Sequence, residues 1–194
     1  MRHRHAHVNI TDPSALRALA HPLRLRILGS LRADGPQTVG KLSGRLDAAP
    51  GSISYHLGTL EKHGLIELAP ELARDRRERW WRATAESTRF DPAAAHENPE
   101  QQAAGRAMRT TIVHGYAAAL LAYLESEETL DRAWVAAGTI GDSLAWLTVE
   151  ELAEMSRELE ELSTRWAGRS ARDTGGARTG AHPVTIQYAA YRRP

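Results

Sequence analysis

Apolar residues at helical spacing, interrupted by turn residues at short intervals, dominate residues 23–65. Three such series occur in this stretch, and they are Leu23, Ile27, Leu28 and Leu31; Val39, Leu42 and Leu46; and Ile53, Leu57 and Leu60. Residues three or four positions apart share one face of a helix, so each series predicts a short amphipathic helix. The short segments between the series leave little chain for the turns. The sequence therefore predicts three short helices around one core, the last two forming a helix-turn-helix.

Capping and turn residues predict where the first helices begin and end. Asp12 can cap an earlier helix, and Pro13 suits its first helical position. The pair His21-Pro22 interrupts that helix and starts the next one. Asp34-Gly35-Pro36 is a strong stop. Residues 1–10 precede these elements, and we expect them to form a mobile arm.

Two strands are predicted after the third helix. Gly64 suits the left-handed position that ends a helix, with Leu65 packing back on Leu60. Residues 65–68 and 78–83 alternate as strands do, and the charged loop 70–77 joins them. A hairpin after a helix-turn-helix is a wing, so we expect a winged helix-turn-helix domain over residues 11–90.

The polar side chains of this domain gather in two places. The third helix, residues 51–63, carries a polar stripe opposite its apolar one, and the loop after it is rich in arginine. Candidate DNA-binding residues in these places, with the preceding helix cap Thr38, are Ser52, Ser54, Tyr55, His56, Thr59, Lys62, Arg74, Arg76, Arg77 and Arg79. Hydrogen-bonding side chains on a helix can read base edges in the major groove, and arginines on a wing can contact the backbone or the minor groove. The alternative interpretation is a solvated helix face and a solvated loop.

Charge is distributed unevenly along the chain. Residues 1–90 carry 15 Lys and Arg against 9 Asp and Glu, whereas residues 91–194 carry 10 against 15. The first part is therefore the one suited to a polyanion. The chain has no cysteine, which excludes disulfides and thiolate metal sites. Neither a secretory signal nor a membrane-length apolar run is present, so we expect a soluble, cytoplasmic protein without cofactors and with no membrane partner.

Several motifs in order resemble the ArsR-type winged-helix transcriptional regulators that carry an additional C-terminal domain. They are ALAHPLRLRIL at residues 18–28, SISYHL at 52–57, LEKHGLI at 60–66 and ERWWR at 78–82. The resemblance covers about residues 14–85. It implies a homodimer that binds an inverted-repeat operator in double-stranded DNA, most often as a repressor relieved by an effector. Metal-sensing members place cysteines where this chain has residues 38–42, so that metal site cannot exist here.

The rest of the chain is predicted to form a second domain. Residues 91–99 are the candidate linker, and residues 100–194 the dimerisation and candidate effector domain. We expect a helix over 100–125, an extended segment over 133–147, a helix that starts at a capping box Thr148–Glu151, a flexible loop over 167–181 and a closing strand over 184–191. The fold class is thus α+β, mainly α, with a small antiparallel sheet. The helical stripe Met108, Ile112, Tyr116, Leu120 and Tyr123 could be core, dimer seam or the wall of a small-molecule pocket, which Trp134, Trp146 and Trp166 could also line.

Three further functions are suggested by features of the sequence. A winged helix can serve as a protein–protein interaction module without reading DNA. Gly141-Asp142-Ser143-Leu144 matches an esterase signature, but no Asp-x-x-His follows it, so we expect no catalysis by Ser143 and no enzyme. His3, His5 and His7 alternate near the N-terminus and could chelate a transition metal weakly.

Overall fold

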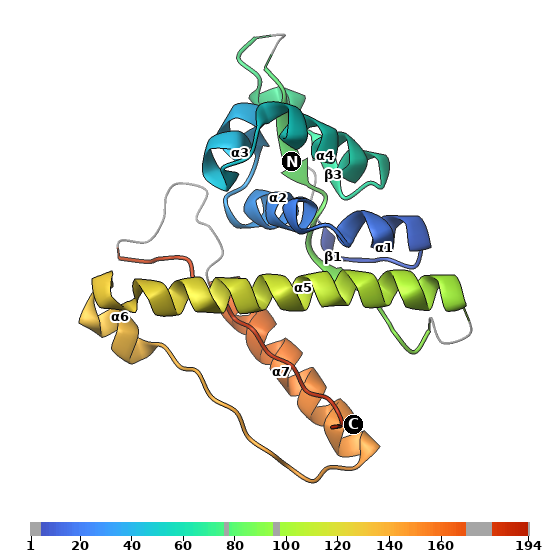
Figure 1. Cartoon of the computed structure of the whole chain (residues 1–194), viewed down its shortest axis with the longest axis vertical. Coiled ribbons are helices and arrows are strands. Elements are labelled where there is room, and N and C mark those ends of the chain that lie inside the picture. Colours follow the sequence, from blue (N-terminus) through green and yellow to red (C-terminus); the bar gives the residue numbers. More distant parts are fainter. Residues whose placement is uncertain (1–4, 76–77, 95–97, 170–179, 194) are drawn as a thin grey trace. The chain divides into compact units, whose positions relative to one another are not determined.

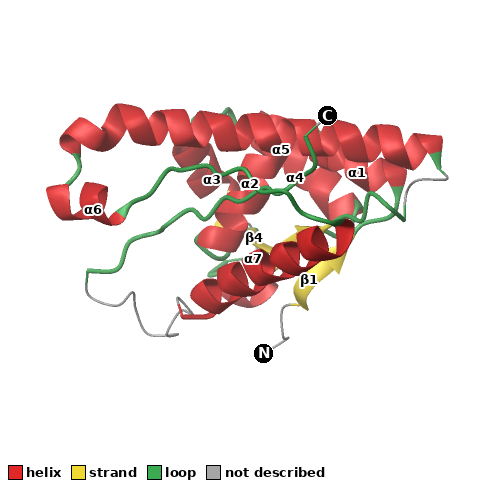
Figure 2. Cartoon of the chain, turned by 90° about the horizontal axis from the view of Figure 1, so that it is seen from below, coloured by secondary structure: helices red, strands yellow, loops and turns green. Residues whose placement is uncertain are grey.

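The computed structural model describes residues 5–75, 78–94, 98–169 and 180–193, most of them helical (Figure 1). Two compact units, Met1–Leu124 and Glu125–Pro194, make up the chain, and each is described by itself. The elements that begin in the first unit are β1 (His5–Asn9), α1 (Pro13–Leu19), α2 (Pro22–Ala33), β2 (Gln37–Thr38), α3 (Val39–Leu46), α4 (Pro50–Lys62), β3 (Ile66–Leu68), a 3-10 turn (Pro70–Leu72), β4 (Trp80–Ala83), β5 (Ala85–Arg89) and α5 (Pro99–Ser126). The mainly helical fold with a small antiparallel sheet confirms the predicted fold class (Figure 2).

Side-chain caps start the first two helices where the sequence predicted them. The Asp12 carboxylate accepts hydrogen bonds from the backbone N–H groups of Ser14 and Ala15, at 3.0 and 3.3 Å. His21 Nδ1 accepts from the Leu23 N–H at 3.2 Å and begins α2. Each cap satisfies N–H groups that have no acceptor within the helix. The short helix α1 and the break before α2 therefore follow from local chemistry.

The end of α4 is a Schellman motif, as predicted. Gly64 has a φ of 66°, which glycine adopts without steric cost. Its N–H donates to Glu61 O at 2.8 Å, and the Leu65 N–H donates to Leu60 O at 3.0 Å. These bonds turn the chain directly from α4 into β3.

The wing is built on a three-stranded antiparallel sheet in the order β2-β4-β3. Trp81 of β4 pairs with Gln37 on one side and with Leu68 on the other. The two wing strands confirm the prediction. The short strand β2 was not predicted, because two residues are too few to show an alternating pattern.

The expected mobile arm is wrong for residues 5–9, which form strand β1. This strand runs parallel to β5, with His5 opposite Ala85 and Asn9 opposite Arg89. The Ile10 N–H continues the pairing to Arg89 O at 3.0 Å, and Ile10 itself is buried. The backbone pairing with a distant strand, rather than the local sequence, orders this segment.

The core of the first unit joins the predicted apolar faces of α1 to α4. Its largest fully buried side chains are Leu16, Leu19, Ile27, Leu28, Leu31, Leu42, Ile53, Leu57, Leu60, Leu65 and Ile66. The start of α5 reaches this core through Ala104 and Met108. The compact unit thus extends beyond residues 91–99, the expected linker, to Leu124.

At Gly105, helix α5 packs closely against Phe90, which follows β5. A Cβ atom added at Gly105 would clash with the tip of the Phe90 ring. The same ring packs on the core and lies 5.5 Å from the Arg109 guanidinium. The absence of a side chain at residue 105 therefore lets helix and ring approach closely.

We expect Gly105→Ala to lower the free energy of unfolding by about 1–3 kcal/mol, because the ring must leave its place. Helix propensity alone predicts the opposite sign, since Ala stabilises a helix by up to about 1 kcal/mol over Gly. Gly115→Ala in the same helix is the matched control, because nothing lies within 4 Å of its added Cβ. Urea denaturation of both variants measures the difference, and equal stabilisation by both would contradict the packing argument.

The second unit holds a 3-10 turn (Glu127–Thr129), α6 (Arg132–Ala137) and α7 (Val149–Arg169), after the last residues of α5. The predicted capping box is confirmed, since the Thr148 N–H donates to Glu151 Oε2 at 2.7 Å and the Glu151 N–H to Thr148 Oγ1 at 3.2 Å. The extended segment predicted over 133–147 is wrong at its start, where α6 forms. The closing strand predicted over 184–191 is also wrong, because those residues pair with no strand in the described part of the chain. Among the described helices, none is long and apolar enough to cross a bilayer.

Candidate nucleic-acid interface

Helix α4 is fixed to the domain along one side. Ile53, Leu57 and Leu60 are buried on that side. The turn that leads into α4 is held by two bonds to its backbone, because Arg26 Nη2 donates to Leu46 O at 2.9 Å and Ser43 Oγ donates to Ala48 O at 2.6 Å. Asp47 adopts a left-handed φ of 48° in this turn. The geometry between α3 and α4 is therefore rigidly specified.

The opposite side of α4 is exposed. Ser54, Tyr55 and Lys62 lie there, and Tyr55 is 69% exposed although it is a large aromatic residue. Ser52 and Thr59 are half-buried at the edges, and Thr59 Oγ1 donates to Tyr55 O at 3.1 Å. The structure thus places Ser54, Tyr55 and Lys62 of the predicted stripe on one accessible face.

His56 does not belong to this face, contrary to the expectation from its polarity. It is 6% exposed, and its ring centroid lies 4.4 Å from that of His21. Arg24 Nη1 lies 3.5 Å from His56 Nδ1. Burial lowers the pKa of both His21 and His56 below the ordinary value. We therefore remove His56 from the candidate DNA contacts and treat it as part of the seam between α2 and α4.

Thr38 acts first as a helix cap. Its Oγ1 accepts from the Lys41 N–H at 3.3 Å at the start of α3, and the side chain is half-buried. Lys41 is exposed beside it, and its Nζ lies 4.3 Å from the centre of the Trp80 ring. Sequence reasoning missed this cation, because a lone lysine on a short helix carries no pattern. Trp80 packs within its own domain through this contact, and Trp81 is in the core.

The wing carries acids among its arginines. Arg74 and Arg79 are exposed, whereas Arg76 and Arg77 lie outside the described residues. The Arg74 N–H donates to Glu78 Oε2 at 2.9 Å, and this bond lowers the pKa of Glu78. Arg82 is held by Glu67 at 2.7 Å and by Glu71. Residues 70–79 contain four Arg and three acidic residues, so their formal net charge is only +1.

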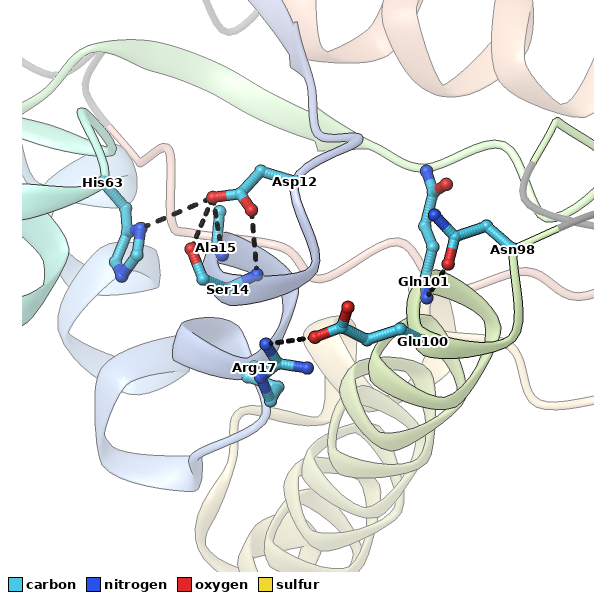
Figure 3. A network of polar contacts seen from close by, with 8 residues as sticks. All are labelled: Asp12, Ser14, Ala15, Arg17, His63, Asn98, Glu100 and Gln101. Carbon is cyan, nitrogen blue, oxygen red and sulfur yellow. Dashed lines mark hydrogen bonds and ion pairs between the residues drawn. The ribbon is translucent and has the colours of Figure 1, made fainter.

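Polar contacts at α1 connect α4 with α5 (Figure 3). His63, which follows α4, lies with Nδ1 4.0 Å from Asp12 Oδ2 at the start of α1. Arg17, in the last turn of α1, pairs with Glu100 in the first turn of α5 at 2.8 Å. Asn98 caps α5 by accepting from the Gln101 N–H at 3.1 Å. The exposed ion pair contributes little stability, so its value is in orientation.

Sequence patterns linked Ser143, the N-terminal histidines and Trp146 to other functions. Ser143 is exposed in a segment without regular secondary structure. Among the described residues, no group of three or more His, Asp or Glu side chains is placed to hold a metal ion. His3 lies outside the described residues, and the side chain of His5 is likewise not described. Trp146 is 96% exposed.

One family model and two solved structures are similar to parts of this chain. A family model described as a helix-turn-helix domain matches residues 19–69. No curated protein sequence matches the chain. Among solved structures, a double mutant of Lactococcus lactis ZitR in apo form is 18% identical, with 76% of this chain and 83% of that chain covered and a TM-score of 0.34. A second structure of that mutant is 17% identical, covers 75% of each chain and has a TM-score of 0.32. The family match alone identifies residues 19–69, which hold α2, α3 and α4, as a helix-turn-helix domain.

Proposed function

We propose that this chain is a sequence-specific DNA-binding transcriptional regulator that acts as a homodimeric repressor. In this proposal α4 lies in the major groove, and the wing over residues 70–79 lies on the backbone or in the minor groove. The observation that carries the proposal is the two-sided character of α4. One side is fixed by buried leucine and isoleucine, and the other exposes Ser54, Tyr55 and Lys62.

The start of α4 adds a second element suited to DNA. Ala49 provides no side-chain cap, and Pro50 occupies the first turn. The first N–H groups of a helix have no intrahelical acceptor and carry a partial positive charge, so a phosphate can satisfy them. In this proposal Lys41 on α3 and Arg74 and Arg79 on the wing, which are all exposed, add phosphate contacts to this helix end.

The homodimer is supported by the second half of α5. Met108 near the start of α5 is buried, but large apolar side chains further along the helix are exposed. Val113, Leu120 and Leu124 share one face of the helix, and Leu120 and Leu124 are 36% and 43% exposed. No Asp, Glu, Lys or Arg occurs from Thr110 to Leu124. A neutral, apolar face can meet its own copy without bringing like charges together.

Binding to the DNA upstream of the protein's own reading frame tests the proposal. We expect a retarded band at low salt and a symmetric site of two half-sites about 34 Å apart after selection of bound fragments. Deletion of the gene should raise transcription from the promoters recovered. Folded protein that retards no DNA would overturn the proposal and favour a protein–protein module, which a winged helix can also form.

A further inference from the structure

The seam between α2 and α4 contains a polar cluster among its apolar side chains. His56 is the buried imidazole of α4, and it faces His21 at the start of α2 with ring centroids 4.4 Å apart. Tyr55 lies edge-on to the same ring at 5.2 Å. Arg24 of α2 completes the cluster, with Nη1 3.5 Å from His56 Nδ1.

Both imidazoles use Nδ1 as a hydrogen-bond acceptor. The partner of His21 Nδ1 is the Leu23 backbone N–H, which can only donate. The partner of His56 Nδ1 is the Arg24 guanidinium, which also can only donate. An imidazole with an accepting Nδ1 is uncharged, because protonation turns that nitrogen into a donor. Both Nδ1 atoms thus face groups that can only donate, and this arrangement favours the neutral form of each ring.

The charged groups around the pair oppose protonation. Arg24 is permanently cationic, and it is fixed in place because Nη2 donates to Arg17 O at 3.3 Å and Nε donates to Ala18 O. The electrostatic effects on His56 come from His21 and Arg24, and that on His21 from Arg24, all of the same sign. On the far side of the seam, Asp12 lies near His63 rather than near the pair. Acid would therefore bring three positive charges together between α2 and α4.

We propose that His21 and His56 are positioning residues for the recognition helix, which hold α4 against α2 only while both rings are neutral and so make DNA binding sensitive to acid. The inference rests on the proposed function, because α4 is the base-reading helix in it. Protonation removes the cap of α2 and the Arg24 contact of α4 at once. The consequence is a recognition helix that loosens as the pH falls below the ordinary histidine value of about 6.5.

The sign follows from linkage. The pKa of each ring is lowered in the folded protein, so the unfolded chain binds more protons at mildly acidic pH. The stability that the neutral pair supplies is complete above about pH 6.5 and falls as the pH decreases toward the folded pKa values. Over that range each histidine can change the unfolding constant by up to about tenfold per pH unit.

Two substitutions remove the titratable rings and are chosen to disturb the seam little. His21→Asn retains a side-chain acceptor at the N-cap of α2, because asparagine is among the best capping residues. His56→Leu keeps an apolar side chain in the seam, and Arg24 retains its two carbonyl acceptors. His7→Gln is the matched control, since His7 is exposed on β1 and belongs to neither cluster nor proposed interface.

The experiment follows the full-length protein from about pH 7.5 to about pH 5.5. Urea denaturation measures the unfolding constant, ring-proton NMR measures the titration of both histidines, and fluorescence anisotropy measures affinity for the selected DNA fragment. In wild type and His7→Gln the unfolding constant should rise about tenfold or more as the pH falls, and DNA affinity should fall with it. In the double variant His21→Asn, His56→Leu the unfolding constant should change by less than about threefold.

A double variant with the pH profile of wild type would overturn the inference, as would rings that titrate at the ordinary histidine value. If the double variant does not fold, His21→Asn alone decides, since half of the acid effect should disappear with it. A wild type that binds no DNA at neutral pH would overturn the proposed function instead. In that case the unfolding and NMR measurements still confirm or refute the paired histidines.

Discussion

Replacement of the four wing arginines by alanine is expected to weaken DNA binding by about 100-fold or more on every sequence tested. The four residues are Arg74, Arg76, Arg77 and Arg79. Phosphate contacts supply affinity without sequence information, so specific and random DNA should lose alike. The slope of log affinity against log salt should become shallower by about 0.9 for each lost phosphate contact. A titration over about 0.05–0.2 M salt, with both DNAs, measures this.

A control with the same change of net charge separates contact from general attraction. Arg157, Arg165, Arg192 and Arg193 are exposed and lie in the second unit. Their replacement by alanine should leave affinity and salt slope nearly as in wild type. If this second set costs as much as the first, the wing has no special role.

The exposed face of α4 should behave in the opposite way. Ser54→Ala or Tyr55→Ala removes a proposed base contact, and such contacts discriminate between bases by about 1–3 kcal/mol. The ratio of specific to random binding should therefore fall about 5- to 150-fold, while the salt slope stays unchanged. Equal losses on both DNAs for the α4 variants would contradict the proposed division between reading and anchoring.

Two glutamates on the exposed face of α5 are expected to produce the second large effect. Leu120→Glu with Leu124→Glu should convert the dimer into a monomer, because burying an unpaired carboxylate costs several kcal/mol. A monomer binds one half-site only, so operator affinity should fall by at least about 100-fold. Light scattering reports the mass, and anisotropy with the full operator reports the affinity.

The same helix supplies the control for that experiment. Ala118 and Ala122 lie on the side of α5 opposite Leu120, since successive residues turn by about 100°. Ala118→Glu with Ala122→Glu introduces the same charge at nearly the same position along the helix. This variant should remain dimeric. If it dissociates, negative charge anywhere on α5 disrupts the dimer, and the effect is not specific to the proposed seam.

Local signals made most of the first unit predictable. Asp12, Pro13, His21 and Gly64 each act on the backbone within a few residues, and the structure uses each of them as the sequence suggested. The sequence-based prediction placed His56 on the wrong face of α4. Its spacing from Ile53 and Leu60 puts it on the buried stripe, but its polarity suggested the outer face. Periodicity was the better guide, because His21 and Arg24 provide partners that an isolated helix does not show.

Long-range pairing was beyond local reasoning. Residues 184–191 alternate like a strand, yet a strand needs a neighbour, and none pairs with them in the described chain. Residues 5–9 also alternate, with Ala6 and Val8 between polar residues, and they form β1 because β5 supplies the partner. The close packing at Gly105 likewise depends on Phe90, and no rule of sequence spacing connects these two residues.

The pairing of β1 with β5 also sets an order of events during synthesis. His5 leaves the ribosome early, but its partner Ala85 is made about eighty residues later. The first strand must therefore wait, unpaired, while the helices between the two strands are completed. Contacts so distant in sequence close slowly compared with helix formation. A nascent chain stopped before residue 85 would therefore hold the helix-turn-helix without this pairing, and α5, which reaches the same core through Ala104 and Met108, is made later still.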